Sequence, residues 1–266
     1  RELRIPRVRA DRGGVHFGGD IGEALRVCLN SRIGVRVLQR VARFEAPHAD
    51  ALYDGVAEVD WSRWIDARRT MAVRASVKNG QMTHSSYVAQ RTKDAVVDQL
   101  RDRFGARPDV DRRDADVQLA VHINRDVADL FVDVSGQPLT RRGYRRASGD
   151  APLKEHLAAA ILRLSGYRPG EPLVDPMCGS GTFLIEAALW GMGRAVGLAR
   201  DHFGVERWAD HGEERVRQFA ELREEARERA RAQPDVELRG GDHDGELLKI
   251  ASRNAQIAGV KVHFER

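Results

Sequence analysis

The sequence predicts a chain of two parts: an α+β first half built on an antiparallel sheet, and an α/β second half with a parallel, doubly wound sheet. In residues 117–134, two runs of alternating apolar residues flank a short polar turn, which is typical of an antiparallel hairpin. In residues 152–264, predicted helices and strands alternate, which is typical of βαβ units. The two halves therefore differ in sheet type.

The composition excludes several classes of protein. With 42% hydrophobic residues the 266-residue chain can bury a core and is not disordered. No apolar run approaches the roughly 20 residues of a membrane span, and the N-terminus has no apolar signal-peptide segment. Cys28 and Cys178 are too few for a disulfide framework or a zinc cluster. We therefore expect a cytoplasmic protein without membrane contact or a bound metal.

The first half divides into short elements. We expect a strand within residues 13–20, a helix over 21–29, an extended stretch over 33–44 and a helix or turn over 53–65. Alternation over 71–77 predicts a strand. A helix follows over 86–104, whose apolar face should carry Ala89, Val96, Leu100 and Phe104.

The second half begins with a helix at Pro152, because proline suits the first turn of a helix. Its apolar stripe should consist of Leu153, Leu157, Ile161 and Leu164. We then expect a strand at 173–174, a helix over 182–192, a solvated helix over 213–232, a strand over 236–238, a helix over 246–257 and a strand over 260–264.

Charge is distributed unevenly along the chain. Residues 1–150 carry 27 Lys and Arg against 21 Asp and Glu, whereas residues 151–266 carry 17 against 19. The densest basic cluster is the predicted linker at 141–146, where Tyr144 stands among four arginines. Such a cluster is typical of phosphate contact with base stacking, although a basic surface hinge gives the same pattern.

Residues 175–182, Asp-Pro-Met-Cys-Gly-Ser-Gly-Thr, are the most informative stretch. A predicted strand ends in Asp175, and two glycines precede a helix, so that a ligand can approach the backbone and the helix N–H groups. Neither a phosphate loop nor a Gly-x-Gly-x-x-Gly dinucleotide fingerprint is present. An acid here suits an ammonium group better than a pyrophosphate, which favours S-adenosylmethionine.

A second acid should then hold the ribose hydroxyls of that cofactor. Asp242, which follows the next predicted strand, is our candidate, and Asp244 is the alternative. Cys178 has no histidine in its motif to activate it, so we interpret it as loop packing. His243 is interpreted as a residue of a surface turn.

These motifs make the chain similar to the THUMP-domain guanine-N2 RNA methyltransferases, in particular the bacterial enzymes that modify 23S ribosomal RNA. The run at 175–182 is the most specific part of the resemblance. Supporting matches lie at 13–17, 93–98, 142–145, 151–155, 241–244, 254–255 and 258–259.

The resemblance implies a ferredoxin-like region followed by a THUMP RNA-binding domain and a Rossmann-like methyltransferase domain. We expect these over residues 1–50, 51–146 and 147–266. It implies a cofactor site that comprises Pro152, Lys154, Asp175, Pro176, Met177, Cys178, Gly179, Gly181, Thr182 and Asp242. Structured RNA should contact Lys78, Arg91, Lys93, Arg141, Arg142, Tyr144 and Arg145.

The chain departs from the family at its two ends. The family's catalytic motif, Asn-Pro-Pro-Tyr or close to it, is absent, because the sequence contains no Pro-Pro, and we expect that motif beyond Arg266. The family also begins with a further strand and helix before the match at 13–17. We therefore expect an incomplete methyltransferase domain without catalytic residues, in an inactive fragment of a 23S rRNA guanine-N2 methyltransferase. A tRNA guanine-N2 methyltransferase and a non-catalytic RNA-binding module stay open as alternatives.

Overall fold

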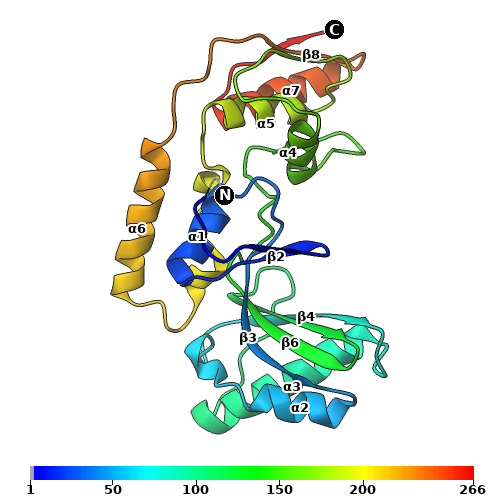
Figure 1. The fold of residues 1–266 in the computed structure, drawn as a ribbon, viewed down its shortest axis with the longest axis vertical. Coiled ribbons are helices and arrows are strands. Elements are labelled where there is room, and N and C mark those ends of the chain that lie inside the picture. The colour runs from blue at the N-terminus through cyan, green and yellow to red at the C-terminus, as the bar shows by residue number, and fades with distance from the viewer. Residues whose placement is uncertain (1–2) are drawn as a thin grey trace. The chain divides into compact units, whose positions relative to one another are not determined.

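The computed structural model describes residues 3–266, which form two compact units (Figure 1). Unit 1 comprises the described residues up to 35 together with 138–201 and 217–266, and unit 2 comprises 36–137 and 202–216. In the described part of the chain, no helix has the length and apolar character needed to cross a membrane.

Unit 2 contains a four-stranded sheet in the order β3-β6-β5-β4. The strands are β3 (Leu38–Glu45), β4 (Met71–Lys78), β5 (Val117–Asn124) and β6 (Val127–Asp133). The predicted hairpin is confirmed as β5 and β6, which pair antiparallel, whereas β4 runs parallel to β5. Arg125 and Asp126 form its two-residue turn with φ angles of 51° and 60°, as a hairpin turn that follows the twist of the strands requires.

Two helices cover one face of this sheet, α2 (Ala49–Ala57) and α3 (Ser85–Phe104), and leave the other face without a helix (Figure 1). Two short 3₁₀ turns complete the unit, η1 (Trp61–Arg63) and η3 (Gly204–Arg207). Val96 and Leu100 of α3 are fully buried, as expected, but Phe104 is 41% exposed. Phe104 is the last residue of α3 before the left-handed Gly105, so the prediction for it is wrong.

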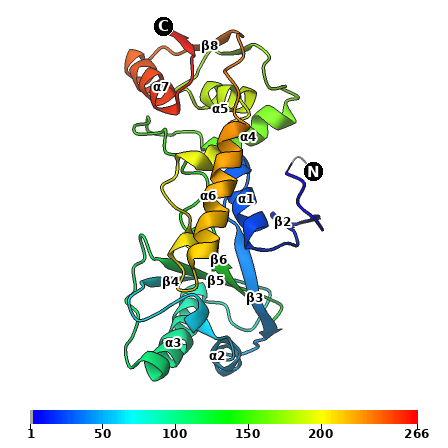
Figure 2. The ribbon, with the colours of Figure 1, turned by 90° about the vertical axis from the view of Figure 1, so that its left-hand side faces the viewer.

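Unit 1 begins with a hairpin of β1 (Arg9–Asp11) and β2 (Gly14–His16), followed by α1 (Ile21–Asn30). Asp20 caps α1 through hydrogen bonds from two backbone N–H groups. Residues 217–228 of α6 (Glu213–Glu228) lie alongside α1, with Arg26 and Glu225 3.3 Å apart (Figure 2). A 3₁₀ turn, η2 (Val196–Ala199), also contacts α1.

The rest of unit 1 is the predicted parallel sheet with its helices. The strands β7 (Leu173–Asp175), β8 (Leu238–Gly241) and β9 (His263–Glu265) pair in that order, all in parallel. The helices are α4 (Glu155–Leu164), α5 (Thr182–Gly191) and α7 (Gly245–Ala258). Since strands and helices alternate along the chain, the carboxyl ends of β7 and β8 meet at one edge of the sheet.

The buried face of α4 differs from the predicted one. Leu157 and Ile161 are each 45% exposed and Leu164 is 87% exposed. The buried residues are instead Ala158, Ala159 and Leu162. Because α4 packs against α5, its two alanines allow a closer approach of the helices than leucines would.

Candidate functional site

A glycine loop connects the carboxyl end of β7 to α5. Gly179 and Gly181 adopt φ angles of 53° and 80°, which residues with a side chain rarely tolerate. A Cβ at Gly181 would lie 3.1 Å from the Phe264 ring and 3.2 Å from Ala251, whereas a Cβ at Gly179 would meet no atom within 4 Å. One side of the loop therefore packs on the sheet and α7, and the other side faces open space.

Asp242 joins this loop to the loop after β8. Its Oδ2 accepts the Gly179 N–H at 2.9 Å and its Oδ1 accepts the Asp244 N–H at 3.0 Å. These backbone donors hold the pKa of the Asp242 carboxyl below its usual range. The Cys178 N–H donates to the Gly241 carbonyl at 2.8 Å. The structure thus brings residues 177–179 and the acid that follows β8 into one site.

Asp175 provides a second carboxylate at the same edge. Burial and the nearby Asp242 charge raise the pKa of Asp175, against a smaller effect of the Met177 N–H that it accepts at 3.2 Å. A half-buried carboxylate next to another acid is stabilised by a bound cation. The site therefore favours a ligand with a positive group near Asp175.

The N-terminus of α5 favours the opposite charge. Gly181 is the N-cap and has no side chain to accept from the first-turn N–H groups. Those N–H groups and the helix dipole stabilise an anion such as a carboxylate. One edge of the sheet thus offers a carboxylate that favours a cation and helix N–H groups that favour an anion. A zwitterionic ligand requires both.

The environment of Cys178 disfavours its thiolate form. Burial and the charges of Asp175 and Asp242 raise the pKa of the Cys178 thiol to about 11. The thiol is therefore protonated at neutral pH. Its side chain is 6% exposed and belongs to the apolar core of unit 1.

Asp244, the alternative ribose ligand, has a structural role. It is the N-cap of α7, and its Oδ1 accepts the N–H groups of Glu246 at 2.8 Å and Leu247 at 3.4 Å. Its carboxylate therefore stabilises the start of α7. Of the two acids, Asp242 contacts the glycine loop.

Asn254 lies in one of the segments that match the family, but the sequence analysis did not assign it to the site. Its side chain on α7 is buried, and Nδ2 donates to the Ser180 and Ala147 carbonyls, each at 3.3 Å. Its Oδ1 accepts the Arg146 N–H at 3.3 Å. Asn254 therefore fixes the glycine loop and residues 146–147 together. The available signal was an amide between the apolar positions Ala251 and Ala255 of a predicted helix.

Residues 152–155 are linked to the site through Arg145. The Arg145 guanidinium donates to the Glu155 carboxylate at 2.9 Å, the Leu153 carbonyl at 2.7 Å and the Thr182 hydroxyl at 2.9 Å. It thereby ties the start of α4 to the first residue of α5. Pro152 and Lys154, the two residues predicted from this segment, are exposed, and Lys154 is the N-cap of α4.

The structure corrects the expectation that Arg142 and Tyr144 contact RNA. The Arg142 side chain is 2% exposed, and its Nε lies 2.9 Å from Oε1 of the fully buried Glu186. The Tyr144 hydroxyl donates to the same oxygen at 3.2 Å, and burial raises the pKa of Tyr144 well above its usual value. Both side chains therefore stabilise the interior of unit 1. Arg145 is likewise held within the protein, with its side chain 16% exposed.

The other residues expected to contact RNA lie nearer the surface. Arg141 and Lys78 are exposed. Arg91 pairs with Asp50 at 3.0 Å and lies 4.3 Å from the centroid of the Tyr53 ring, and Lys93 pairs with Asp94 at 2.8 Å. Lys78 thus presents its charge more freely than Arg91 or Lys93. Within residues 3–266, no group of three or more His, Cys, Asp or Glu side chains is arranged to hold a metal ion.

Three family models match consecutive parts of the chain. They are the RlmL ferredoxin-like domain over residues 1–38, the THUMP domain over 46–133 and the RMKL-like methyltransferase domain over 142–265. The third covers the glycine loop and Asp242, and its match ends beside Arg266, the exposed residue that follows β9. The catalytic motif expected beyond Arg266 stays a prediction.

Known proteins resemble the chain over nearly its whole length. The ribosomal RNA large subunit methyltransferase K/L of Syntrophotalea carbinolica is 43% identical over 100% of this chain and 38% of its own length. The chain spans 35% to 38% of such curated relatives.

Two solved structures are similar as well. A predicted N6-adenine-specific DNA methylase from Listeria monocytogenes has a TM-score of 0.86 and 31% identity, with 97% of this chain and 68% of that one covered. SMU.472, solved as a complex with SAH, has a TM-score of 0.83 and 32% identity, with 97% and 69% covered. From the three domain models and these relatives, the chain belongs to the family of THUMP-containing methyltransferases with an RMKL-like methyltransferase domain.

Proposed function

We propose that this chain binds S-adenosylmethionine and RNA as part of an enzyme that methylates the exocyclic N2 amine of a guanine in 23S ribosomal RNA. The observation that carries the cofactor assignment is the hydrogen bond from the Gly179 N–H to Asp242 Oδ2, which joins the acidic loops of two adjacent parallel strands. The relatives named ribosomal RNA large subunit methyltransferase K/L support the choice of RNA. The division of the chain into domains at residues 50 and 146 stays a prediction.

The residues of the site fit S-adenosylmethionine by their chemistry. Asp175 would hold its ammonium group, because burial and the nearby Asp242 charge disfavour the ionised carboxylate and a bound cation would stabilise it. The uncapped first turn of α5 would hold its carboxylate. Asp242 would accept from the ribose hydroxyls, since each of its oxygens has a second lone pair beyond its backbone contact. No phosphate-binding residue is needed for this ligand.

When bound, S-adenosylmethionine supplies an electrophilic methyl group on its sulfonium sulfur. The contribution of this chain is to bind and orient. Asn254 and Asp242 fix the glycine loop from two sides, so that the loop needs little reordering when a ligand binds. The protonated Cys178 thiol makes no competing nucleophile.

Isothermal titration calorimetry with S-adenosylhomocysteine tests the cofactor site. We expect the unmodified chain to bind, and Asp242→Ala and Asp242→Asn to weaken binding at least about tenfold, as loss of a charge-assisted hydrogen bond implies. Asp235→Asn is the matched control, because Asp235 is an exposed acid before β8. Absence of binding by the unmodified chain would contradict the proposal and favour an RNA-binding module.

The substrate needs a separate test. The full-length protein that carries this sequence should transfer tritium-labelled methyl groups to unmodified 23S rRNA, with N2-methylguanosine as the product on nucleoside chromatography. Transfer to tRNA alone would support the tRNA alternative, and transfer to adenine in DNA would match the name of the Listeria monocytogenes structure instead. Because rRNA is modified where ribosomes assemble, the proposal also places the protein in the cytoplasm.

A further inference from the structure

The face of the unit 2 sheet that faces away from α2 and α3 has its own chemistry. Strand pairing sets Arg74, Ala120, Phe131 and Arg40 side by side across the four strands. The next row on this face contains Ser76, His122, Asp129 and Arg43, and the row after it contains Lys78, Asn124, Val127 and Glu45. Since alternate residues of a strand point to opposite faces, these rows form one surface, which we call the open face.

The cations of the open face are accessible. The side chains of Arg40, Arg43 and Arg74 are 49%, 58% and 44% exposed. Lys78 is exposed at the end of β4. Glu45, on the far edge strand, is the one exposed acid in these three rows.

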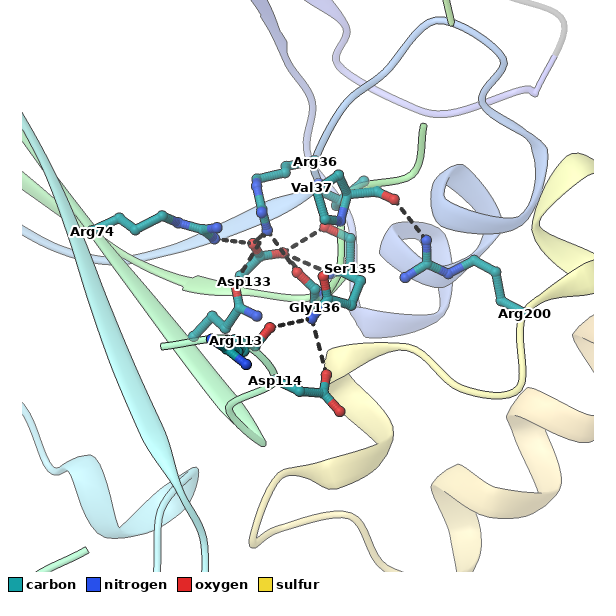
Figure 3. A network of polar contacts seen from close by, with 12 residues as sticks. Arg36, Val37, Arg74, Arg113, Asp114, Asp133, Ser135, Gly136 and Arg200 are labelled. Atoms are coloured by element: carbon teal, nitrogen blue, oxygen red, sulfur yellow. Dashed lines mark hydrogen bonds and ion pairs between the residues drawn. The ribbon is translucent and has the colours of Figure 1, made fainter. Parts of the chain in front are cut away.

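Two acids, Asp129 and Asp133, do not neutralise the arginines around them, because each of these acids is shared between two arginines. Asp129 lies 3.3 Å from Arg40 and 3.3 Å from Arg43. Asp133 pairs with Arg36 and, at 2.9 Å, with Arg74 (Figure 3). One carboxylate neutralises one guanidinium, so each group keeps one uncompensated positive charge.

The Asp133 group is the more tightly built of the two. The carboxylate is fully buried and also accepts the N–H groups of Ser135 at 2.9 Å and Gly136 at 3.1 Å (Figure 3). Its charge is therefore divided among several donors. Burial and repulsion from Arg36 lower the pKa of Arg74, and a bound anion would relieve that repulsion.

Two rings lie between the arginine groups. The His122 and Phe131 side chains stand on adjacent strands with ring centroids 5.1 Å apart. Burial lowers the pKa of His122, so its ring is neutral at physiological pH. Neutral rings flanked by cations are suited to stacking of bases between phosphate contacts.

We propose that the open face binds a single-stranded segment of RNA, with phosphates at Arg43, Arg74 and Lys78 and bases stacked on His122 and Phe131. Strands lie about 4.8 Å apart, so the face is about 14 Å wide, which suits a single strand of a few nucleotides. A duplex keeps its base faces stacked inside and offers nothing to the two rings. This proposal rests on the RNA-binding part of the proposed function and specifies its surface.

Fluorescence anisotropy with a short labelled oligouridylate, measured over a series of salt concentrations, tests the proposal on the 266-residue chain. The double variant Arg43→Ala, Lys78→Ala should make the slope of log affinity against log salt less steep by about 1.4, from about 0.7 for each phosphate contact with a single strand. Phe131→Leu should weaken binding about fivefold or more without a change of slope, since stacking of one base contributes at least about 1 kcal/mol.

The matched control is Arg101→Ala, Arg103→Ala, which removes two exposed cations from α3 on the other side of the sheet and should leave the slope unchanged. If the two double variants change the salt slope equally, the open face is not the RNA-binding surface. The proposal that the chain binds RNA would be unaffected by that result. If the open-face variants weaken binding of a duplex of the same length more than they weaken binding of the single strand, the single-strand assignment is wrong. No binding of either probe by the unmodified chain would overturn this proposal and the RNA-binding part of the proposed function together, while cofactor binding is judged by calorimetry.

Discussion

Replacement of Arg142 by methionine separates two roles for this residue. The linker sequence predicts an RNA contact, whereas the structure places the Arg142 guanidinium inside unit 1 beside Glu186. If Arg142 contacts RNA, its loss changes RNA affinity and leaves stability unchanged. If it neutralises Glu186, its loss destabilises unit 1 and leaves the salt dependence of RNA binding unchanged.

The geometry gives the size of the expected effect. At 2.9 Å, the Coulomb attraction between Arg142 and Glu186 is about 6 kcal/mol for an effective dielectric constant of about 20. The cost of burying both charges offsets much of this attraction, but removal of one partner leaves the other unpaired. Arg32 lies 3.9 Å from Glu186 and compensates only in part. We therefore expect a loss of about 3–5 kcal/mol in the free energy of unfolding of unit 1.

Hydrogen–deuterium exchange resolves the two units, because peptides from α5 report on unit 1 and peptides from β5 on unit 2. In Arg142→Met, the slowest amides of α5 should exchange roughly a hundredfold to several thousandfold faster, whereas those of β5 should not change. Arg146→Met is the matched control, since Arg146 is an exposed arginine of the same linker. It should shift stability by less than about 0.5 kcal/mol.

Two results would refute this reasoning. The first is unchanged exchange of α5 in Arg142→Met. The second is a loss of about 0.7 from the salt slope of RNA binding with stability intact, which would show a direct phosphate contact.

Three further predictions concern the cofactor site. Gly240→Ala places a Cβ 2.7 Å from Leu184 and 2.8 Å from Phe264, so thermal unfolding should show a loss of about 1–3 kcal/mol; an unchanged melting temperature would contradict the packing. Asp244→Ala removes the N-cap of α7 and should cost about 1 kcal/mol in urea titrations, whereas Asp244→Ser should recover most of it. The pKa of Asp175 is raised in the folded state. The protonated carboxyl therefore stabilises the fold below its unfolded pKa of about 3.9, and this stabilisation is lost as the pH rises through the folded-state pKa. Asp175→Asn should therefore be more stable than the unmodified chain at pH 7, equally stable in acid, and weaker in binding S-adenosylhomocysteine; equal melting curves at both pH values would count against the raised pKa.

Local patterns predicted those elements whose residues contact sequence neighbours. The alternation in β5 and β6, the period of α3 and the glycine loop before α5 all depend on residues a few positions apart. Asp175 and Asp242 could be placed at one edge because adjacent parallel strands end together. The sequence alone therefore predicted the β5–β6 hairpin, the parallel sheet of unit 1 and the position of the proposed cofactor site, but not the parallel pairing of β4 with β5.

Contacts between distant residues decided the rest. Periodicity predicted a buried stripe of leucine and isoleucine on α4, but this helix packs against α5 and buries Ala158, Ala159 and Leu162 instead. Arg142 is buried because Glu186, 44 positions away, needs a counter-ion in an interior that cannot solvate a charge. Asn254 likewise acts on a loop more than 70 positions away. A linear pattern records whether a residue is polar, but its partner, and hence its role, depends on which segments the tertiary structure brings together.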